Sequence, residues 1–364
     1  MIFLLYLHNN GSREFRSGLV SIVFLLLLVA IIVVQISFSQ FVYVISQNIT
    51  RTIIGSSSNY DNNFTISTRG HFDLATGEPI PEHNSTDYLY YDNIEHRTND
   101  SLQNEIMCPS EKEIVIYIHG AWTDEISANE QVNRTAMSLQ LNNNTIPLIG
   151  FSWDSNTSFS EEGWKNAKTI AASNGPKLAQ FILDFKNKCE DSDIRLIAHS
   201  LGASVVNSTL VSLSNNQGMN TNSDFNITSV HLLGAAIDRG EIAANTTFGK
   251  TIEQVVDNFY NLRNAEDNML EYIYRNVEKE DALGLLGIQH SLPIPGDYIE
   301  RQVDTEIPPI QDADGNSKLD CFDYFVLLPG DNHCGYIGFR GLPPFENILR
   351  SDGSMDVVVQ DWQK

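Results

Sequence analysis

The stretch "IRLIAHSLGAS", Ile194–Ser204, is the part of the sequence that decides the fold. Its first half is a short apolar run with β-branched residues, which is typical of a buried β-strand. The run ends abruptly at Ser200, and small residues and helix formers follow at once. Ala198 and Gly202 lie two positions before and after the serine, so a strained and crowded turn fits there. The stretch predicts a strand, a tight turn that carries a serine, and a helix.

The rest of the chain repeats this alternation of short apolar runs and longer amphipathic runs. Strands that are apolar throughout and are separated by helices indicate a parallel sheet covered on both faces, so the predicted fold class is α/β. Ligands of such sheets bind at the carboxyl ends of the strands. The predicted strands cover residues 64–68, 88–91, 113–120, 145–153, 194–198, 229–233, 255–262 and 324–328, and the predicted helices cover residues 164–185, 203–213 and 268–277.

The segment Ala198–Gly202 matches the nucleophile elbow of serine enzymes, except that Ala198 stands in place of the first glycine. An ordinary strand-to-helix connection that contains a serine by chance is the alternative interpretation. A nucleophilic serine needs two backbone N–H groups that face the developing oxyanion. One of them follows the nucleophile directly, and here it belongs to Leu201.

The segment "YIHGAWTD", Tyr117–Asp124, supplies the loop that this chemistry requires after an earlier strand. Gly120 permits a tight backbone turn, and Ala121 would present the second N–H group. We interpret His119 as a structural residue that hydrogen-bonds the backbone of this loop. The segment therefore favours the catalytic interpretation of Ser200 over the ordinary one.

The base and the acid are found from the chain order of serine, acid and histidine in this kind of site. His290 and His333 lie beyond the candidate acids, and His333 is favoured because it follows a predicted strand through the turn "PGDN". Asp267, in the loop after the strand that ends near residue 262, is the favoured acid. Glu266 and Asp238 stay open as alternatives.

Residues 113–340 resemble an α/β-hydrolase of the lipase/esterase type. The resemblance rests on "HG", "FSW", "AHSLG", "LLGAAID", "NxxxxEDNML" and "NHCGY", which occur in this order and cover about two thirds of the chain. It implies a mostly parallel central sheet with helices on both faces. The connection Gly234–Val255, where this fold usually inserts a cap, is short, so no large cap domain is expected. The loop from residue 283 to 318 is the remaining candidate for partial cover.

The resemblance also implies the roles of the residues. Ser200 would attack an acyl carbon, His333 would take and return the proton, and Asp267 would fix the imidazole tautomer. The expected activity is that of a serine hydrolase that cleaves carboxylic esters, including lipid esters, through an acyl-enzyme and without a required cofactor. The alternatives are an amidase, peptidase or acyltransferase with the same triad, or a catalytically silent surface protein that binds through this scaffold.

The N-terminal region indicates export. Arg13 and Arg16 precede Leu19–Val34, an uncharged apolar run that is long enough for a membrane span or a signal peptide. We expect residues 1–46 to be this anchor or signal segment, residues 47–104 to be a polar, glycosylated stalk with edge strands, and residues 105–364 to be the catalytic domain. Acceptor triplets for N-glycosylation support a cell-surface or secreted location; they begin at Asn48, Asn63, Asn84, Asn99, Asn133, Asn143, Asn156, Asn207, Asn226 and Asn245.

Charge and one acidic segment bear on partners and cofactors. The net charge of −23 and the lack of a basic stripe argue against nucleic-acid binding, and no pattern indicates a protein partner. Residues 312–323 place oxygen side chains at the spacing of a calcium-binding loop, although the glycine stands at position 4 instead of 6. A polar Asx-rich turn is the alternative. The calcium ligands would be Asp312, Asp314, Asn316, Asp320 and Asp323.

The pairing of the four cysteines follows from the α/β-hydrolase fold that the resemblance implies. Cys108 and Cys189 each lie five residues before a strand, and these two strands are parallel neighbours in this fold. Their leading segments would emerge side by side, which predicts a Cys108–Cys189 disulfide. Cys321 and Cys334 remain, and their bridge would clamp the loop that carries His333.

Overall fold

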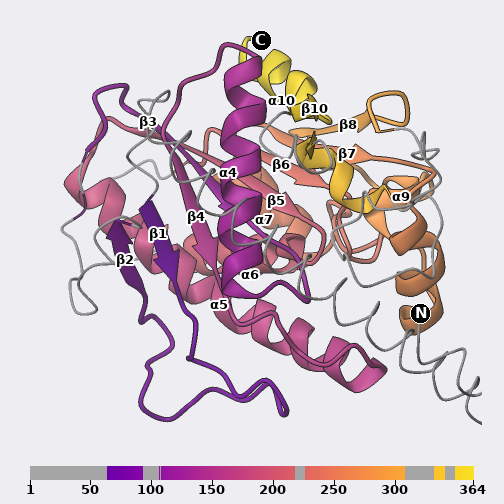
Figure 1. Cartoon of the computed structure of the whole chain (residues 1–364), viewed down its shortest axis with the longest axis horizontal. Coiled ribbons are helices and arrows are strands. Elements are labelled where there is room, and N and C mark those ends of the chain that lie inside the picture. Colours follow the sequence, from indigo (N-terminus) through magenta and orange to yellow (C-terminus); the bar gives the residue numbers. More distant parts are fainter. Residues whose placement is uncertain (1–63, 93–105, 107, 218–225, 308–331, 341–348) are drawn as a thin grey trace, which may run out of the picture. The chain divides into compact units, whose positions relative to one another are not determined.

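The computed structural model of the chain describes residues 64–92, 106, 108–217, 226–307, 332–340 and 349–364. Its centre is an eight-stranded sheet with the strand order β2-β1-β4-β3-β5-β6-β7-β8 (Figure 1). All neighbouring strands run parallel except β1 and β2, which pair antiparallel at one edge. The strands are β1 Phe64–Ser67, β2 Leu89–Asp92, β3 Glu113–Ile118, β4 Leu148–Ser152, β5 Asp193–His199, β6 Ser229–Leu233, β7 Phe259–Arg263 and β8 Tyr298–Gln302.

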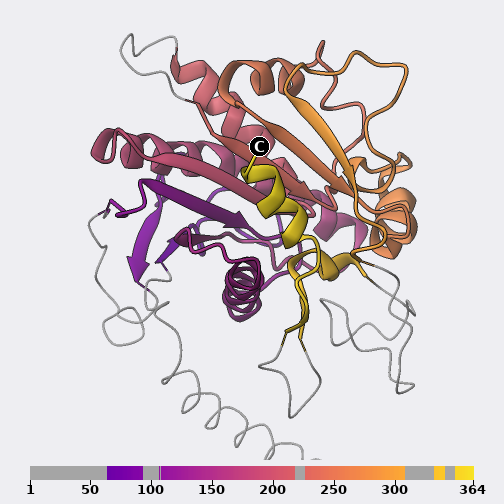
Figure 2. The same cartoon turned by 90° about the horizontal axis from the view of Figure 1, so that it is seen from above.

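Helices cover both faces of this sheet, as Figures 1 and 2 show. They are α4 Glu125–Leu141, α5 Glu161–Lys188, α6 Gly202–Gln217, α7 Thr247–Val255, η1 Met269–Tyr274, α8 Arg275–Glu278, α9 Leu283–Leu286, η2 His333–Ile337 and α10 Met355–Trp362; β9 Phe339–Arg340 and β10 Leu349–Ser351 form a separate short hairpin. The predicted α/β-hydrolase fold, with a mostly parallel sheet, helices on both faces and no cap domain among the described residues, is confirmed.

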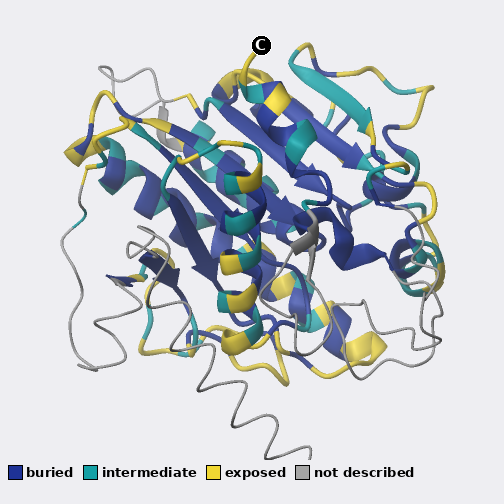
Figure 3. Cartoon of the chain, turned by 45° about the horizontal axis from the view of Figure 1, so that its top comes forward, coloured by how far each residue is buried: buried dark blue, intermediate teal, exposed yellow. Residues whose placement is uncertain are grey.

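The alternation of side chains along β3 divides the core into two layers. Ile114, Ile116 and Ile118 pack with buried residues of α5, α6 and α7. Val115 and Tyr117 point to the other face, where they pack with residues of α4 and α10. Because both faces of the central strands are buried, these strands are apolar throughout, and Figure 3 shows them dark blue.

The helix pair α5 and α6 fixes the helix that follows Ser200. The two helices approach so closely that a Cβ atom on Gly175 would lie 2.3 Å from Cβ of Ser208. The Ser208 hydroxyl donates a hydrogen bond of 2.5 Å to the carbonyl oxygen of Ala172. Ser160 caps the N-terminus of α5 by accepting from the N–H of Gly163. The position of α6 is thus set by close packing against a long, capped helix.

Several predicted elements differ from those observed. The predicted strand at residues 255–262 begins only at Phe259, because residues 247–255 form α7, whose N-terminus is capped by Thr246. The predicted loop at residues 283–318 contains α9 and the edge strand β8, whose sequence "YIERQ" is mostly polar because it borders solvent. The helix α4 lacked a prediction of its own, and the predicted strand at residues 324–328 lies outside the described residues.

The N-terminal region lies partly inside and partly outside the described residues. Residues 64–92, which lie in the segment expected to be a polar stalk with edge strands, supply β1 and β2 to the central sheet. Within the described ranges, no helix is both long and apolar enough to span a membrane. The apolar run Leu19–Val34 lies outside those ranges.

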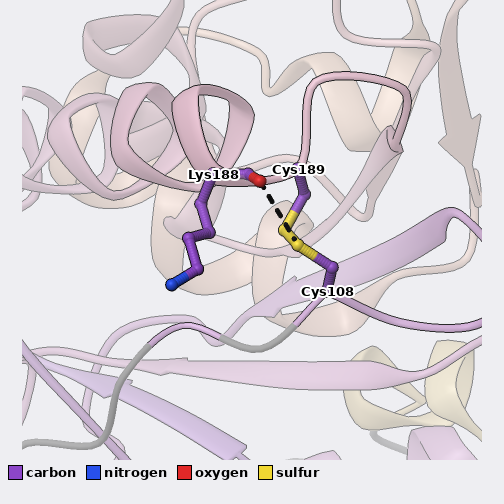
Figure 4. The surroundings of a disulfide bond; sticks show 3 residues. All are labelled: Cys108, Lys188 and Cys189. Carbon is purple, nitrogen blue, oxygen red and sulfur yellow. Dashed lines mark hydrogen bonds between the residues drawn. A yellow bond between two sulfur atoms is a disulfide. The ribbon is translucent and has the colours of Figure 1, made fainter.

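The predicted Cys108–Cys189 disulfide is present, with a Cα–Cα distance of 5.5 Å (Figure 4). The register explains it, because Glu113 of β3 pairs with Asp193 of β5, so the segments before both strands start at the same level. The carbonyl oxygen of Lys188 lies 3.5 Å from Sγ of Cys108. Cys321 lies outside the described residues, so the Cys321–Cys334 bridge stays a prediction.

Replacing Cys108 and Cys189 together by Ser is expected to lower the free energy of unfolding by about 4 kcal/mol, because the bridge closes a loop with a sequence separation of 81. Turnover at 25 °C should stay near the wild-type value, since the bridge precedes the amino ends of the strands. Chemical denaturation and ester hydrolysis would measure the two effects. A large loss of turnover in the folded variant would contradict this separation of stability from activity.

Candidate active site

Ser200 lies in a strained turn between β5 and α6. Its φ is +55°, a left-handed conformation that costs a residue with a Cβ about 1–3 kcal/mol. Two hydrogen bonds hold the turn: the Ser200 N–H donates to the carbonyl oxygen of Leu233 at 3.0 Å, and the Ser200 carbonyl accepts from the N–H of Ala236 at 3.1 Å. The serine therefore stands at the carboxyl end of the sheet in a conformation that the surrounding strands enforce.

Small residues make room for this turn. A Cβ atom on Gly202 would lie 2.7 Å from the carbonyl oxygen of Ile118, and one on Gly120 would lie 2.7 Å from Cβ of Ser200. Both contacts are too short for any side chain. The glycine loop after β3 and the turn after β5 are consequently in direct contact, as a nucleophile and its oxyanion donors require.

Residues 119–123, which we call the oxyanion loop, carry one of the two candidate donors. Neither the N–H of Ala121 nor that of Leu201 donates to an acceptor within the described parts of the chain, and both residues are buried. The next residue, Trp122, has a φ of +53°, and its N–H donates to the carbonyl oxygen of Ser155 at 2.8 Å. A strained residue held this way fixes the path of the loop.

His119 holds the oxyanion loop in place through contacts of both of its ring nitrogens. Its Nδ1 lies 2.9 Å from the carbonyl oxygen of Gly120, and because a carbonyl only accepts, Nδ1 carries the proton. Its Nε2 accepts from the backbone N–H of Trp153 at 3.1 Å. Burial, followed by the nearby positive charge of Arg69, holds the pKa of His119 well below its usual value. The ring is therefore neutral, with a defined tautomer.

Asp267 and His333 form a buried pair, although 66 residues separate them in the chain. The Nδ1 of His333 lies 2.7 Å from Oδ2 of Asp267. The same carboxylate accepts from the N–H of Leu270 at 3.0 Å and from the hydroxyl of Tyr336 at 3.2 Å. Burial raises the pKa of Tyr336 well above its usual value, so this hydroxyl stays a donor. With Nδ1 directed at Asp267, Nε2 is the basic nitrogen of His333.

His199 fixes the backbone of the candidate base. Its Nε2 donates to the carbonyl oxygen of His333 at 2.8 Å, and the two rings lie 4.7 Å apart between centroids. Burial, followed by the charge of His333, lowers the pKa of His199 to about 3. This histidine therefore stays neutral at physiological pH and acts as a fixed hydrogen-bond donor.

Ser200 and His333 line the same two narrow clefts, of about 30 and 20 Å³. The first is bounded by the oxyanion loop and by Gln131. The second is mostly apolar and is lined by Trp122, Trp164, Ala236, Met269, Leu270, Ile273, Tyr274 and Val277. A larger polar cavity of about 440 Å³ shares Ala236 and Tyr274 with the apolar cleft. The serine and the histidine thus open onto one site.

The alternative residues lie elsewhere. The side chain of Glu266 is exposed, and His290 is exposed on a loop. Asp238 accepts from the N–H of Gly240 at 2.7 Å and lines the larger cavity. The described residues contain no group of His, Cys, Asp and Glu side chains that could hold a metal. The predicted calcium ligands at residues 312–323 lie outside them, so calcium stays a prediction.

Four residues of the site had no predicted role in it: Arg69, Trp122, His199 and Tyr336. Tyr336 lies three positions after His333, a spacing that a short helical turn brings back to the same side, and η2 is such a turn. His199 adjoins the serine in sequence. These two signals were readable from the motifs "AHSLG" and "NHCGY", whereas the contacts of Arg69 depend on strand order alone.

An eight-stranded α/β sheet with a strained serine after its fifth strand and a buried Asp–His pair defines the α/β-hydrolase class of protein. The model of one family within that class, described as "Alpha/beta hydrolase of unknown function (DUF900)", matches residues 94–289. The chain belongs to this family. The match includes Ser200 and Asp267 but neither Arg69 nor His333. No curated protein matches the sequence.

Three solved structures are similar to parts of the chain. They are XC6422 from Xanthomonas campestris, a serine hydrolase without a lid (12% identity, 52% of this chain and 71% of that chain, TM-score 0.29); phospholipase PlaB from Legionella pneumophila (14%, 44% and 39%, 0.28); and the catalytic core domain of acetyl xylan esterase from Trichoderma reesei (13%, 36% and 66%, 0.25). Similarity at this level transfers no activity to the chain.

Asp267→Asn is expected to lower kcat by about 10⁴-fold, because the amide would favour the wrong tautomer of His333. Asp238→Asn should change kcat little, since Asp238 lies in the polar cavity without a bond to His333. Steady-state kinetics on a short ester would measure both variants. The reverse ranking of the two variants would assign the role of the acid to Asp238.

Proposed function

We propose that the chain is an exported serine hydrolase that cleaves carboxylic esters, with Ser200 as nucleophile, His333 as base and Asp267 as the residue that orients the base. The observation that carries the proposal is the buried bond of 2.7 Å between His333 and Asp267, together with a strained Ser200 that lines the same clefts as His333. The family assignment supports hydrolysis as the class of reaction.

The proposed reaction has two halves. Ser200 Oγ forms a bond to the acyl carbon while Nε2 of His333 takes the serine proton, and the carbonyl electron pair moves onto the oxygen. The N–H groups of Ala121 and Leu201 stabilise that oxyanion. Collapse expels the alkoxide, which receives the proton from His333. Water then attacks the acyl-enzyme by the same steps and restores Ser200.

The clefts favour esters of apolar, short acyl groups. The apolar cleft beside Ser200 offers aromatic and aliphatic side chains, and its free volume of about 20 Å³ leaves room for only the first carbons of an acyl chain before any side chain moves. The polar cavity of about 440 Å³, which adjoins it through Ala236 and Tyr274, offers room for the alcohol part of the ester. A lipid ester with a long acyl chain would fit only if side chains of the apolar cleft moved apart.

Export is the proposed cellular route, and membrane attachment through the N-terminal apolar run is part of it. Seven of the predicted glycosylation acceptors lie in the described ranges, and all except Asn207 are exposed: Asn84, Asn133, Asn143, Asn156, Asn226 and Asn245. Asn207 is half-buried on α6, and its amide lies 3.4 Å from a carboxylate oxygen of Glu241. This distribution supports a glycosylated protein.

A fluorophosphonate probe tests the proposal, because it labels serines that are activated as nucleophiles. The full chain, expressed through a secretory pathway, should be labelled at Ser200 and should hydrolyse p-nitrophenyl acetate and butyrate faster than the matching anilides. Treatment with a glycosidase should increase its mobility on a gel. A wild-type protein that is neither labelled nor active on any of these esters would refute the assignment of a serine hydrolase and favour a binding protein.

A further inference from the structure

Arg69 connects the N-terminal edge of the sheet to the oxyanion loop. Its Nε donates to Oγ of Ser152 at 2.9 Å. Its Nη2 donates to the carbonyl oxygen of Thr123 at 3.0 Å and lies 3.1 Å from Nε2 of His119. One planar guanidinium therefore contacts the end of β4 and both ends of the oxyanion loop.

The turn that carries Arg69 is itself firmly held. The two carboxylate oxygens of Asp154 accept from the N–H groups of Gly70 and Phe72, each at 3.0 Å. The N–H of Thr68 donates to the carbonyl oxygen of Ser152 at 2.9 Å. Backbone hydrogen bonds on both sides of Arg69 thus fix the base of its side chain. The position of the guanidinium at the oxyanion loop is therefore set by this fixed turn.

The chemistry of the contacts points to orientation and not to charge pairing. Burial lowers the pKa of Arg69, while the negative charges of Asp154, Glu125 and Asp124 act against that shift. The direct acceptors, however, are a hydroxyl, a carbonyl and an imidazole. Arginine is suited to such a task because it stays charged and presents its donors in a rigid plane.

The effect on the candidate oxyanion donor follows from the planarity of the peptide bond. Arg69 and the N–H of Trp153 both direct donors at Nε2 of His119, so the His119 proton stays on Nδ1. That Nδ1–H holds the carbonyl oxygen of Gly120 at 2.9 Å. The Gly120 carbonyl and the Ala121 N–H belong to one planar trans peptide and point in opposite directions. Fixing the carbonyl therefore fixes the direction of the Ala121 N–H.

We propose that Arg69 is a positioning residue, which orients the Ala121 N–H toward the oxyanion through His119 and the carbonyl of Gly120. The inference rests on the proposed function and adds to it a residue that lies outside the matched family region, residues 94–289. It also assigns a part in the active site to the turn that follows β1, which lies in the segment expected to be a stalk. Loss of the Arg69 guanidinium should leave the Ala121 N–H in place but should make its direction less fixed.

The test compares Arg69→Gln and Arg69→Lys with the control Arg301→Gln in the full chain. Arg301, on the edge strand β8, is also half-buried, but it pairs with Asp361 of α10 and lines none of the three clefts and cavities described above. Arg69→Gln should lower kcat by about 10- to 100-fold with little change in KM, since small misplacements of a catalytic group cost this much. Arg69→Lys should lose less, and Arg301→Gln should keep the wild-type kcat.

A second readout separates orientation of the donor from a general loss of structure. A thionoester carries sulfur in place of the carbonyl oxygen and uses oxyanion donors poorly, so the ratio of oxoester to thionoester rates reports on those donors. Arg69→Gln should lower this ratio. Equal losses on both esters, or no loss of kcat, would overturn the role of Arg69 while wild-type activity and Ser200 labelling keep the proposed function intact. A wild-type protein that shows neither esterase activity nor labelling of Ser200 would reject both the proposed function and the role of Arg69.

Discussion

Ser200→Ala is expected to abolish ester hydrolysis, with a fall in kcat of about 10⁴- to 10⁶-fold. The reason is that, among the described residues with a hydroxyl group, Ser200 alone lines both clefts with His333, and the strained turn holds its side chain at the carboxyl end of the sheet. The residual rate would come from the oxyanion donors and from binding alone. Hydrolysis of p-nitrophenyl acetate, corrected for the uncatalysed rate, measures the effect.

The fold should survive this change. Losing one hydroxyl at a turn whose backbone bonds run to Leu233 and Ala236 should change the free energy of unfolding by less than about 1 kcal/mol. Ser212→Ala is the matched control, because Ser212 lies on α6 and, within the described ranges, its hydroxyl donates to the carbonyl oxygen of Ser208 alone. Full fluorophosphonate labelling of Ser200→Ala would exclude Ser200 as the nucleophile.

The central elements could be predicted because their local signals agree. The run before Ser200 is apolar, its neighbours are small, and helix formers follow, so pattern and turn chemistry indicate the same strand, turn and helix. The Cys108–Cys189 bridge was predicted from the parallel pairing of two strands that the α/β-hydrolase resemblance implies, and these strands, β3 and β5, are paired in the structure. The chain order of the fold left Glu266, Asp238 and His290 as alternatives, and the structure places the favoured residues, Asp267 and His333, in contact.

The parts that the sequence did not predict depend on contacts across the sheet. The strand β8 is polar because it borders solvent, so its composition resembles a loop, and α7 was hidden because its apolar residues adjoin those of the next strand. Arg69 reaches the oxyanion loop only because β1 pairs with β4, and nothing near Arg69 in the sequence indicates that pairing. Such residues are placed by tertiary structure, and single-sequence patterns carry no signal of them.

His333→Ala is expected to reduce kcat about as strongly as Ser200→Ala, by about 10⁴- to 10⁶-fold, because members of a triad act as a unit. The structure gives His333 the geometry of a base: Nδ1 bonds Asp267, the backbone is held by His199, and the side chain borders both clefts with Ser200. Since Ser200 would lose its proton acceptor, the double variant Ser200→Ala/His333→Ala should be little slower than either single variant.

His290→Ala is the matched control, because this histidine is exposed on a loop, and its kcat should equal that of the wild type. Circular dichroism and thermal unfolding should show whether the His333→Ala variant is folded. Misfolding is the main alternative explanation of a loss, because the change removes a side chain that contacts the buried Asp267, which also accepts from Tyr336. His333→Gln, which keeps most of the volume, tests the same point. If a folded His333→Gln variant hydrolysed esters at the wild-type rate, or if His290→Ala lost as much as His333→Ala, the base would have to be assigned to another residue.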